Sequence, residues 1–380
     1  MELKKNTTPP RKTEDNGGVM LMLLIFILAG AFSSIAQEMG CVNSVVNMTL
    51  SILPGSFILV GMFIASCLVS LSIGTSCGTI AALTPIAVGI ASATSANVPM
   101  ATAVVVGGSL FGDNLSFIQS TIMATKTQGC RMSDKFKANI GIALPASIIA
   151  IIAYLFIGSG IESQTGGDIG NPLNVLPYLV VFILAIAGMN VIWVLIMGII
   201  TAIVLALSYG TMDIPSIWEA MQKGVLGMHD LIIVTIIAAV IIDQLRKRGA
   251  IDWLIMNMGR IISSRRGAEL SIAGAVVAVD LLTANNTIAI LAVGPVARSI
   301  SYRYGIEAKR AASILNTMSC FAQGIIPWGA QLLIAAGLAS INPLDIIPYL
   351  YYPYILGTIT ILNIIFYKKK ATDTDCHEKK

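Results

Sequence analysis

One carboxylate stands alone in a long uncharged stretch of the sequence. Asp113 is preceded by Glu38 and followed by Lys126 as the nearest Asp, Glu, Lys or Arg residues. Residues 107–121 around it are rich in Gly, Ser and Thr. An ionisable group at membrane depth is costly, so it is expected to face the protein interior or a water-filled cavity and to have a function. The alternative is a solvated carboxylate in a surface loop between two helices.

A buried carboxylate can bind either a proton or a metal ion, because burial disfavours its charged form and either cation neutralises it. Competition of two cations for one carboxylate is enough to couple their fluxes in opposite directions. Oxygen-bearing side chains that suit hard cations such as Na⁺ gather with Asp113 at breaks in the apolar sequence. The predicted ion-binding residues are Asp113, where we place Na⁺, and Asn114, Ser116, Thr75, Ser76, Thr79, Asp280, Thr283, Asn285, Asn286 and Gln323. Hydroxyls in membrane helices also bond to the backbone, which is the competing interpretation of the Ser and Thr residues.

The composition indicates an integral membrane protein. Apolar residues make up 56% of the chain and charged residues 12%, whereas a soluble domain has about 25% charged residues. The net charge of +4 is attributed to membrane topology, and no nucleic-acid partner is expected. Six cysteines without Cys-x-x-Cys spacing and only two histidines make a zinc site improbable, and no cofactor is expected.

The apolar runs predict an all-α polytopic protein with about eight full crossings and both termini in the cytoplasm. The expected parts are a disordered cytoplasmic arm (1–18), a first half (19–158), middle spans with a cytoplasmic interfacial segment (159–267), a second half (268–367) and a cytoplasmic tail (368–380). The first span covers residues 19–37, and residues 38–51 form a polar connection. The loop with Lys126, Arg131, Lys135 and Lys137 is placed inside by the positive-inside rule, whereas residues 211–228 are placed at the outer surface.

Two long apolar segments are interrupted in a similar way, at residues 74–79 and 283–287. They predict two discontinuous helices, each followed by a re-entrant hairpin, with Asp113 and Asn114 at the tip of the first hairpin. Thr75-x-x-x-Thr79 matches Thr283-x-x-x-Thr287 at an offset of 208, and Phe111 matches Phe321 at an offset of 210. The first hairpin would have to enter from the cytoplasm and the second from outside. This pattern is an inverted-topology repeat, although it would place the basic residues Arg303, Lys309 and Arg310 outside, against the positive-inside rule.

At these motifs the sequence resembles the NhaC family of sodium/proton antiporters, within the broader ion-transporter superfamily. The residues that carry the resemblance are those at 74–79, 107–116, 125–130 and 326–329, and Gly112-Asp113-Asn114-Leu115-Ser116 is the most specific piece. The resemblance implies Na⁺ efflux driven by H⁺ entry in a bacterial cytoplasmic membrane, with Asp113 as the leading ion carboxylate. Relatives that exchange organic acids such as malate and lactate, or carry amino acids, leave the substrate open.

The sequence therefore predicts a secondary transporter that exchanges Na⁺ or Li⁺ for H⁺ by alternating access and is not an enzyme. Its partners would be small cations, protons and the lipid bilayer, and a homodimer is left open. A Na⁺- or H⁺-coupled carrier of an organic acid or amino acid is the alternative, disfavoured because no fixed cation is predicted deep in the membrane. A passive channel is a second alternative. An intramembrane aspartyl protease would require Asp113 and Asp280 to form a dyad that shares one proton.

Overall fold

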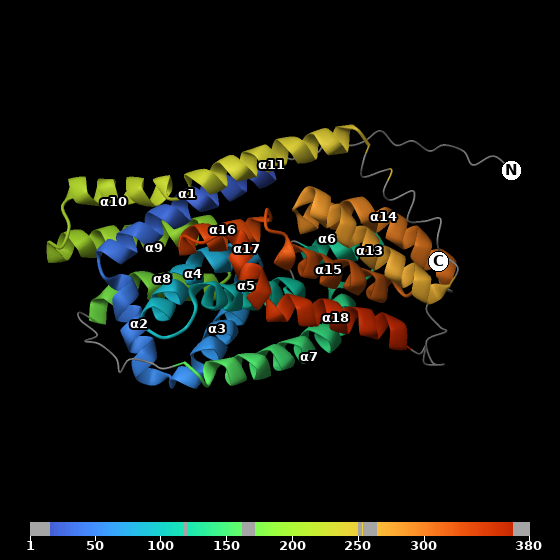
Figure 1. The fold of residues 1–380 in the computed structure, drawn as a ribbon. Helices are drawn as coiled ribbons and strands as arrows, with labels where there is room; N and C mark the ends of the chain where they lie inside the picture. Colours follow the sequence, from blue (N-terminus) through green and yellow to red (C-terminus); the bar gives the residue numbers. More distant parts are fainter. Residues whose placement is uncertain (1–15, 117–119, 162–171, 250–252, 254–263, 368–380) are drawn as a thin grey trace.

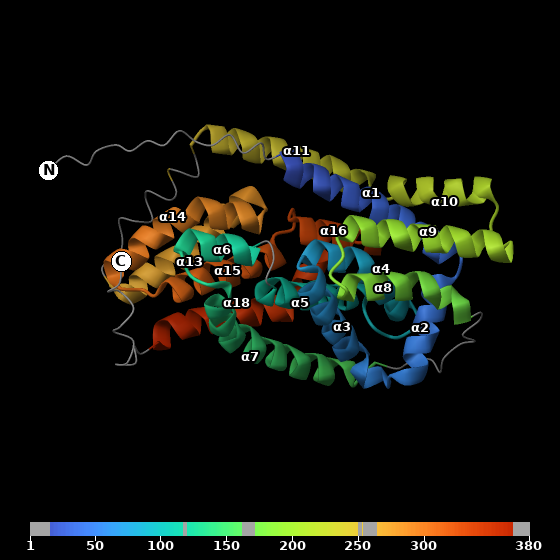
Figure 2. The ribbon, with the colours of Figure 1, turned by 180° about the vertical axis from the view of Figure 1, so that it is seen from behind.

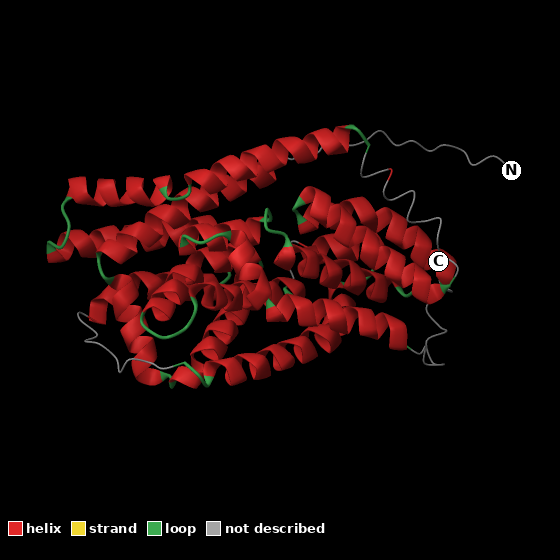
Figure 3. Cartoon of the chain, in the orientation of Figure 1, coloured by secondary structure: helices red, strands yellow, loops and turns green. Residues whose placement is uncertain are grey.

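The computed structural model describes residues 16–116, 120–161, 172–249, 253 and 264–367, which fold almost entirely into helices (Figures 1 and 3). The predicted all-α class is confirmed. The α-helices are α1 (Asn16–Glu38), α2 (Cys41–Ile52), α3 (Ile58–Ile73), α4 (Ser76–Ser92), α5 (Val98–Leu115), α6 (Ser120–Gln128), α7 (Met132–Gly158), α8 (Leu176–Ile186), α9 (Val191–Tyr209), α10 (Ile214–Leu226), α11 (His229–Lys247), α13 (Arg265–Thr283), α14 (Asn286–Tyr304), α15 (Ala308–Ile325), α16 (Ala330–Ala339), α17 (Pro343–Ile346) and α18 (Tyr351–Phe366). Short 3-10 helices lie at Gly55–Phe57, Pro172–Val175 and Ile347–Tyr349.

Several helical stretches are long and apolar enough to cross a bilayer. Five meet this criterion in the described part of the chain, and the pair on either side of Leu350, bent by 56°, would be a sixth. They are Met20–Glu38, Gly55–Ile73, Met132–Gly158, Val191–Tyr209, Ala308–Ala339 and the pair Pro343–Tyr349 with Tyr351–Phe366. The first span is thus found where it was predicted. This number is below the expected eight or so crossings, in part because α4 and α8 are shorter apolar helices.

Two segments predicted as surface or connecting chain are helices that pack on the bundle. Residues 38–51 were expected to be a polar connection, but most of them form α2, whose Val42 and Val46 lie against Gly89 of α4. Residues 211–228 contain α10, which packs along α1 where Gly30 and Gly224 bring the two backbones together. The helix α2 corrects the predicted polar connection, since small and β-branched residues at helical spacing fit a neighbouring helix despite polar residues between them. The location of residues 211–228 at the outer surface stays a prediction. The predicted interfacial segment, 251–262, lies outside the described residues apart from Trp253.

The segments predicted as discontinuous helices are helical hairpins. Helix α3 ends at Gly74, whose φ of 75° is the left-handed conformation that glycine adopts without strain, and α4 begins at Ser76. Gly108 of α5 packs on Ser66 and Gly112 packs on Ser70, so α5 runs parallel to α3. A short link joins the end of α4 to the start of α5, so α4 must run back toward the start of α3.

Helices α13 and α14 turn in the same way, at Ala284 with a φ of 49°. The ion pair of Arg310 with Glu269 and the hydrogen bond of Ser319 to Asp280 show that α15 runs parallel to α13. A short link joins α14 to α15, so α14 also runs back alongside α13. The prediction of breaks at these two positions is therefore right, but the course of the chain beyond them was wrongly predicted.

The segments predicted as hairpins continue past their breaks instead of turning back. Helix α6 packs on α14 and α15, where Gln128 Nε2 donates to Gly294 O at 2.9 Å. Helix α16 packs on α4 and α5, and α15 and α16 together have the length and composition of one membrane span. Figures 1 and 2 show α6 beside α13–α15 and α16 beside α4. Asp113 and Asn114 consequently lie in the last turn of α5 and not at a hairpin tip.

Two successions of helices repeat at a constant spacing along the chain. Helices α4 and α14 start at 76 and 286, α5 and α15 at 98 and 308, and α6 and α16 at 120 and 330, a spacing of 210 residues each time. The predicted match of Phe111 to Phe321 has this spacing, whereas the match of Thr75 to Thr283 is wrong by two residues, because Thr75 corresponds to Asn285. Each unit places its last helix, α6 or α16, on the hairpin of the other unit. The opposite membrane orientation of the two units stays a prediction.

Candidate ion site

The carboxylate of Asp113 lies where the two helical hairpins meet. It is 2% exposed, and its Oδ2 accepts hydrogen bonds from Ser76 Oγ at 3.4 Å and from Asn286 Nδ2 at 3.2 Å. Ser76 and Asn286 are the first residues of α4 and α14 and correspond to each other at the 210-residue spacing. Helix N-termini carry partial positive charge and unpaired N–H groups, which favour an anion nearby. The turns of both hairpins thus stabilise one buried carboxylate at the end of α5.

Gln331 is a further member of this site that the sequence prediction omitted. It lies at the second position of α16, is 4% exposed, and donates from Nε2 to Ser76 Oγ at 3.1 Å. Its Oε1 is buried and has no hydrogen-bond partner among the described residues. A buried amide oxygen without a donor is costly in free energy, unless another ligand satisfies it. We call Asp113, Ser76, Asn286 and Gln331 the Asp113 site; its four side chains come from α5, α4, α14 and α16.

Asn114 belongs to a second polar cluster at the end of α5. Its backbone carbonyl accepts from Lys135 Nζ at 2.8 Å and from Asn139 Nδ2 at 3.0 Å. The same Nδ2 donates to Asn114 Oδ1 at 2.7 Å and to Asn316 Oδ1 at 2.9 Å. Lys135 is 1% exposed and the three asparagines are fully buried. We call Asn114, Lys135, Asn139 and Asn316 the Asn114 network.

The position of Lys135 corrects the sequence prediction, which placed it in a basic cytoplasmic loop and found no fixed cation in the interior. The chain around it is the first turn of α7, and the helix brings both Lys135 and Asn139 to the face that contacts α5 and α15. A signal for this was present, because Lys135 and Asn139 are four residues apart and therefore share one helical face. The neighbouring basic residues favoured a cytoplasmic loop instead.

Asp280 forms a separate cluster with Ser319 and Gln323. Ser319 Oγ donates to Oδ2 at 2.8 Å and Gln323 Nε2 donates to Oδ1 at 2.5 Å. Asp280 is fully buried. Each of its oxygens has its own donor, and among the described residues no hydrogen bond links it to Asp113. A protease dyad needs two carboxylates close enough to share a proton, so these contacts give the protease alternative no support.

The remaining predicted ligands have hydrogen bonds to the backbone. Asn285 Oδ1 accepts from Thr287 N at 3.0 Å and from Ile288 N at 3.2 Å, and so caps α14. Three hydroxyls donate to carbonyls close by in the sequence: Thr79 to Thr75, Thr283 to Asn285, and Ser116 to Asp113. Thr75 is the N-cap residue of α4 without a side-chain cap. These contacts give Asn285, Thr79, Thr283 and Ser116 a local structural role. The part of all five residues in ion binding stays a prediction.

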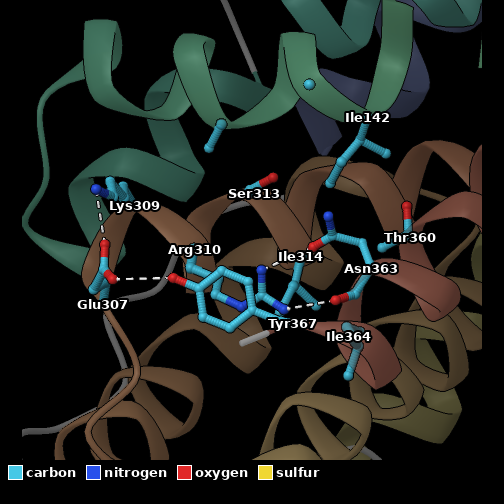
Figure 4. Close-up of a pocket in the computed structure, with 12 residues that line it drawn as sticks. Ile142, Glu307, Lys309, Arg310, Ser313, Ile314, Thr360, Asn363, Ile364 and Tyr367 are labelled. Atoms are coloured by element: carbon cyan, nitrogen blue, oxygen red, sulfur yellow. Dashed lines mark hydrogen bonds and ion pairs between the residues drawn. The ribbon is translucent and has the colours of Figure 1, made fainter. Parts of the chain in front are cut away.

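A pocket of about 190 Å³ lies at the opposite end of α15 from Gln323 (Figure 4). Arg310 beside it pairs with the buried Glu269 through two hydrogen bonds, of 2.8 and 2.6 Å, and donates to Asn363 Oδ1 at 2.8 Å. Its guanidinium also lies 3.8 Å from the centre of the Tyr367 ring, a cation–π contact. The charge of Arg310 is therefore neutralised by a structural ion pair.

This arrangement corrects the predicted position of the basic residues Arg303, Lys309 and Arg310, which lie at the end of α14 and the start of α15. Arg310 contacts Asn363 and Tyr367 at the end of α18, and the pocket also includes Ala138 near the start of α7. The link between α14 and α15 is therefore at the same end of the molecule as the end of α18 and the start of α7. The sequence predicts this link at the opposite end, on the expectation that α13 and α14 form one continuous crossing. If the start of α7 is cytoplasmic, as predicted, these basic residues lie on the same side and agree with the positive-inside rule.

The described part of the chain has several helices long and apolar enough to cross a membrane and buried polar clusters at helix ends, a combination that is typical of membrane transporters. The comparison with known sequences gives its family. The chain belongs to the Na⁺/H⁺ antiporter family, whose model matches residues 16–159 and 173–367.

Its relatives include the Na⁺/H⁺ antiporters NhaC of Alkalihalophilus pseudofirmus and Bacillus subtilis. Each is 24% identical to this chain. The match covers 89% of this chain and 80% of the Alkalihalophilus pseudofirmus protein, and 91% of this chain and 83% of the Bacillus subtilis protein. The malate-2H⁺/Na⁺-lactate antiporter of Bacillus subtilis is 19% identical over 92% of this chain and 83% of its own length. Among solved structures, the YdaH transporter of Alcanivorax borkumensis aligns with a TM-score of 0.44 and 15% identity, covering 92% of this chain and 86% of that one.

Proposed function

We propose that this protein exchanges Na⁺ or Li⁺ for H⁺ across the membrane by alternating access, and that the two cations compete for the carboxylate of Asp113. The observation that carries the proposal is the Asp113 site itself. One buried carboxylate faces the first residues of two helices, beside an amide oxygen of Gln331 that has no hydrogen-bond donor among the described residues. The NhaC relatives, which are Na⁺/H⁺ antiporters, support the same assignment.

The site offers the ligands that a small hard cation requires. Asp113 supplies a charged oxygen, and Ser76 and Gln331 supply neutral oxygens from two other helices. A proton on Asp113 would instead remove the charge that attracts Na⁺, so occupancy by one cation excludes the other. Because the side chains of the site come from both units, a relative movement of the units would change which side of the membrane reaches it.

The test is a substrate panel on the reconstituted full-length protein. Vesicles with an inside-acid pH gradient and an internal pH dye receive NaCl, LiCl, KCl, malate or single amino acids in turn, with protein-free vesicles as the control. Alkalinisation of the vesicle interior with Na⁺ or Li⁺ salts alone is the expected result. A response to KCl as large as the response to NaCl would contradict the proposal. A cation flux that runs in either direction without a pH gradient would indicate a channel.

A carrier of organic acids is the second candidate, and Lys135 is the observation that favours it. A buried ammonium group near the transport site could bind a substrate carboxylate, and one relative is a malate/lactate antiporter. The ammonium already donates to Asn114 O, which favours the cation exchanger. Alkalinisation that requires malate or an amino acid would establish the second candidate.

We further propose that the protein lies in a bacterial cytoplasmic membrane with both termini inside. The basic residues Arg246, Lys247 and Arg248 at the end of α11 and the basic start of α7 support this orientation. Whether the chain acts as a homodimer can be measured by mass photometry in detergent or in lipid nanodiscs.

A further inference from the structure

Lys135 is the largest charged side chain in the interior of the described protein, and the proposed exchange has not yet used it. It is 1% exposed, whereas Lys137, two residues further along α7, is exposed. Burial of an ammonium group is expensive unless opposite charge and hydrogen bonds compensate for it. The groups around Lys135 should therefore show how its buried charge is compensated.

The compensation comes from the end of the helix that carries Asp113. Lys135 Nζ donates to the carbonyl oxygen of Asn114, one residue beyond Asp113 in the last turn of α5. Carbonyls at a helix C-terminus lack intrahelical donors and carry partial negative charge, so they favour a cation. Asp113 carries a negative charge on the residue just before Asn114, and opposite charges attract each other strongly where water is excluded.

This electrostatic interaction must act in both directions. If the negative charge of Asp113 stabilises the Lys135 ammonium, the ammonium stabilises the negative charge of Asp113 to the same extent. A cation that binds to Asp113 has to overcome that stabilisation, because it approaches a carboxylate whose charge is already partly balanced. The charge of Lys135 is then a factor that weakens cation binding and allows release.

We propose that Lys135 is a positioning residue that sets the Na⁺ affinity of the Asp113 site: its positive charge, anchored on the carbonyl of Asn114, opposes the binding of a cation to Asp113. Asn139 shares the same carbonyl and fixes its orientation through Asn316 on α15. The inference rests on the proposed Na⁺/H⁺ exchange. The competing explanation is that Lys135 is only a structural cap for α5.

The test compares three variants in reconstituted vesicles at one fixed pH. Lys135→Gln removes the charge and keeps a donor, Lys135→Arg keeps the charge, and Lys137→Gln is the matched control on the exposed side of the same helix. Coupling free energies between two sites in a protein are typically about 1–3 kcal/mol, which changes an affinity on the order of tenfold. We therefore expect Lys135→Gln to lower the KM for Na⁺ about tenfold, while Lys135→Arg stays near the wild type and Lys137→Gln is unchanged.

A structural cap predicts a different result, which would overturn the inference. Lys135→Gln would then yield less folded protein, with an unaltered KM for Na⁺ in the fraction that folds. A maximal rate that falls while KM stays constant would contradict the inference equally, since a changed binding charge must appear in KM.

A thermal stability cycle keeps the inference testable if Lys135→Gln folds poorly. The melting temperatures of wild type, Asp113→Asn, Lys135→Gln and the double variant are measured in detergent, where no transport is needed. Charge coupling predicts that Lys135→Gln costs several degrees in the wild-type background and markedly less in the Asp113→Asn background. If Lys135→Gln lowers the melting temperature equally in both backgrounds, or if neither Lys135→Gln nor Lys135→Arg folds, Lys135 is only a structural cap for α5. A wild-type protein that responds to no cation would remove the proposed function, and this cycle would still measure the coupling.

Discussion

Replacing Asp113 by asparagine is the most direct perturbation of the proposed mechanism. The substitution keeps the shape of the side chain and removes the charge that a cation and a proton would share. The partners of Oδ2 are Ser76 and Asn286, and the amide oxygen of an asparagine can accept from both. We therefore expect the variant to insert and fold while losing exchange.

The expected loss follows from the electrostatics of the site. Two unit charges 4 Å apart at an effective dielectric constant of about 20 attract each other by about 4 kcal/mol. A factor of ten corresponds to about 1.4 kcal/mol, so the loss of the Asp113 charge should weaken Na⁺ binding by roughly three orders of magnitude. The helix N-termini of α4 and α14 would then repel a cation with no carboxylate to compensate for them.

The assay is Na⁺-driven alkalinisation in vesicles, with Asp243→Asn as the matched control. Asp243 is an exposed carboxylate paired with Lys247 on α11, so its removal should leave exchange at the wild-type rate. Asp113→Asn should give no signal above protein-free vesicles at a Na⁺ concentration that saturates the wild type. If it exchanges Na⁺ for H⁺ at the wild-type rate, the assignment of Asp113 as the shared carboxylate is wrong.

Three further changes test the site and the packing. Gln331→Leu should raise the KM for Na⁺ on the order of tenfold while the protein stays folded, because it removes a neutral ligand, and an unchanged KM would exclude Gln331 as a ligand. Glu269→Gln breaks a buried ion pair and should cost about 3 kcal/mol, measured as a lowered melting temperature, whereas Lys309→Gln at the partly exposed pair with Glu307 should cost less than about 1 kcal/mol. Gly224→Val should destabilise the fold because its Cβ would collide with the backbone carbonyl of Gly30; Gly227→Ala, where a Cβ meets only ordinary contacts, is its control, and equal melting temperatures would contradict the packing.

The sequence located the breaks in the chain well but not the direction of the chain beyond them. Glycine and polar residues interrupt the apolar pattern at residues 74–79 and 283–287, and helices end and begin there. Apolar composition is the same for a helix that crosses and for one that turns back, since both are buried on most sides. The direction is decided by contacts such as Gly112 with Ser70, which join residues far apart in the sequence.

The same reason explains which site residues were predicted. Asp113, Ser76 and Asn286 were found because a carboxylate and polar residues at breaks are rare in apolar sequence. Asn139 was missed because its neighbours in the sequence are ordinary helix residues and its partners lie on other helices. Gln331 lies just after the motif at residues 326–329 and was missed because its partner, Ser76, lies on another helix. Lys135 was missed because a basic residue beside other basic residues is most often exposed. The local signal therefore predicts where a site lies, and the tertiary contacts decide which side chains complete it.

The repeat places the two buried carboxylates at positions that do not correspond. At the 210-residue spacing Asp113 corresponds to Gln323, and Asp280 corresponds to Ser70, whose hydroxyl donates to the carbonyl of Ser109. Gln323 and Ser319 occupy both oxygens of Asp280, whereas Asp113 faces the hairpin turns of both units and a buried amide oxygen of Gln331. The hairpin turns of both halves thus contact the Asp113 site in the same way, but only the first half places a carboxylate there. For this reason we expect that only Asp113 binds the exchanged cations. Asp280 would instead hold Gln323 and Ser319 in place at the end of α15 by hydrogen bonds.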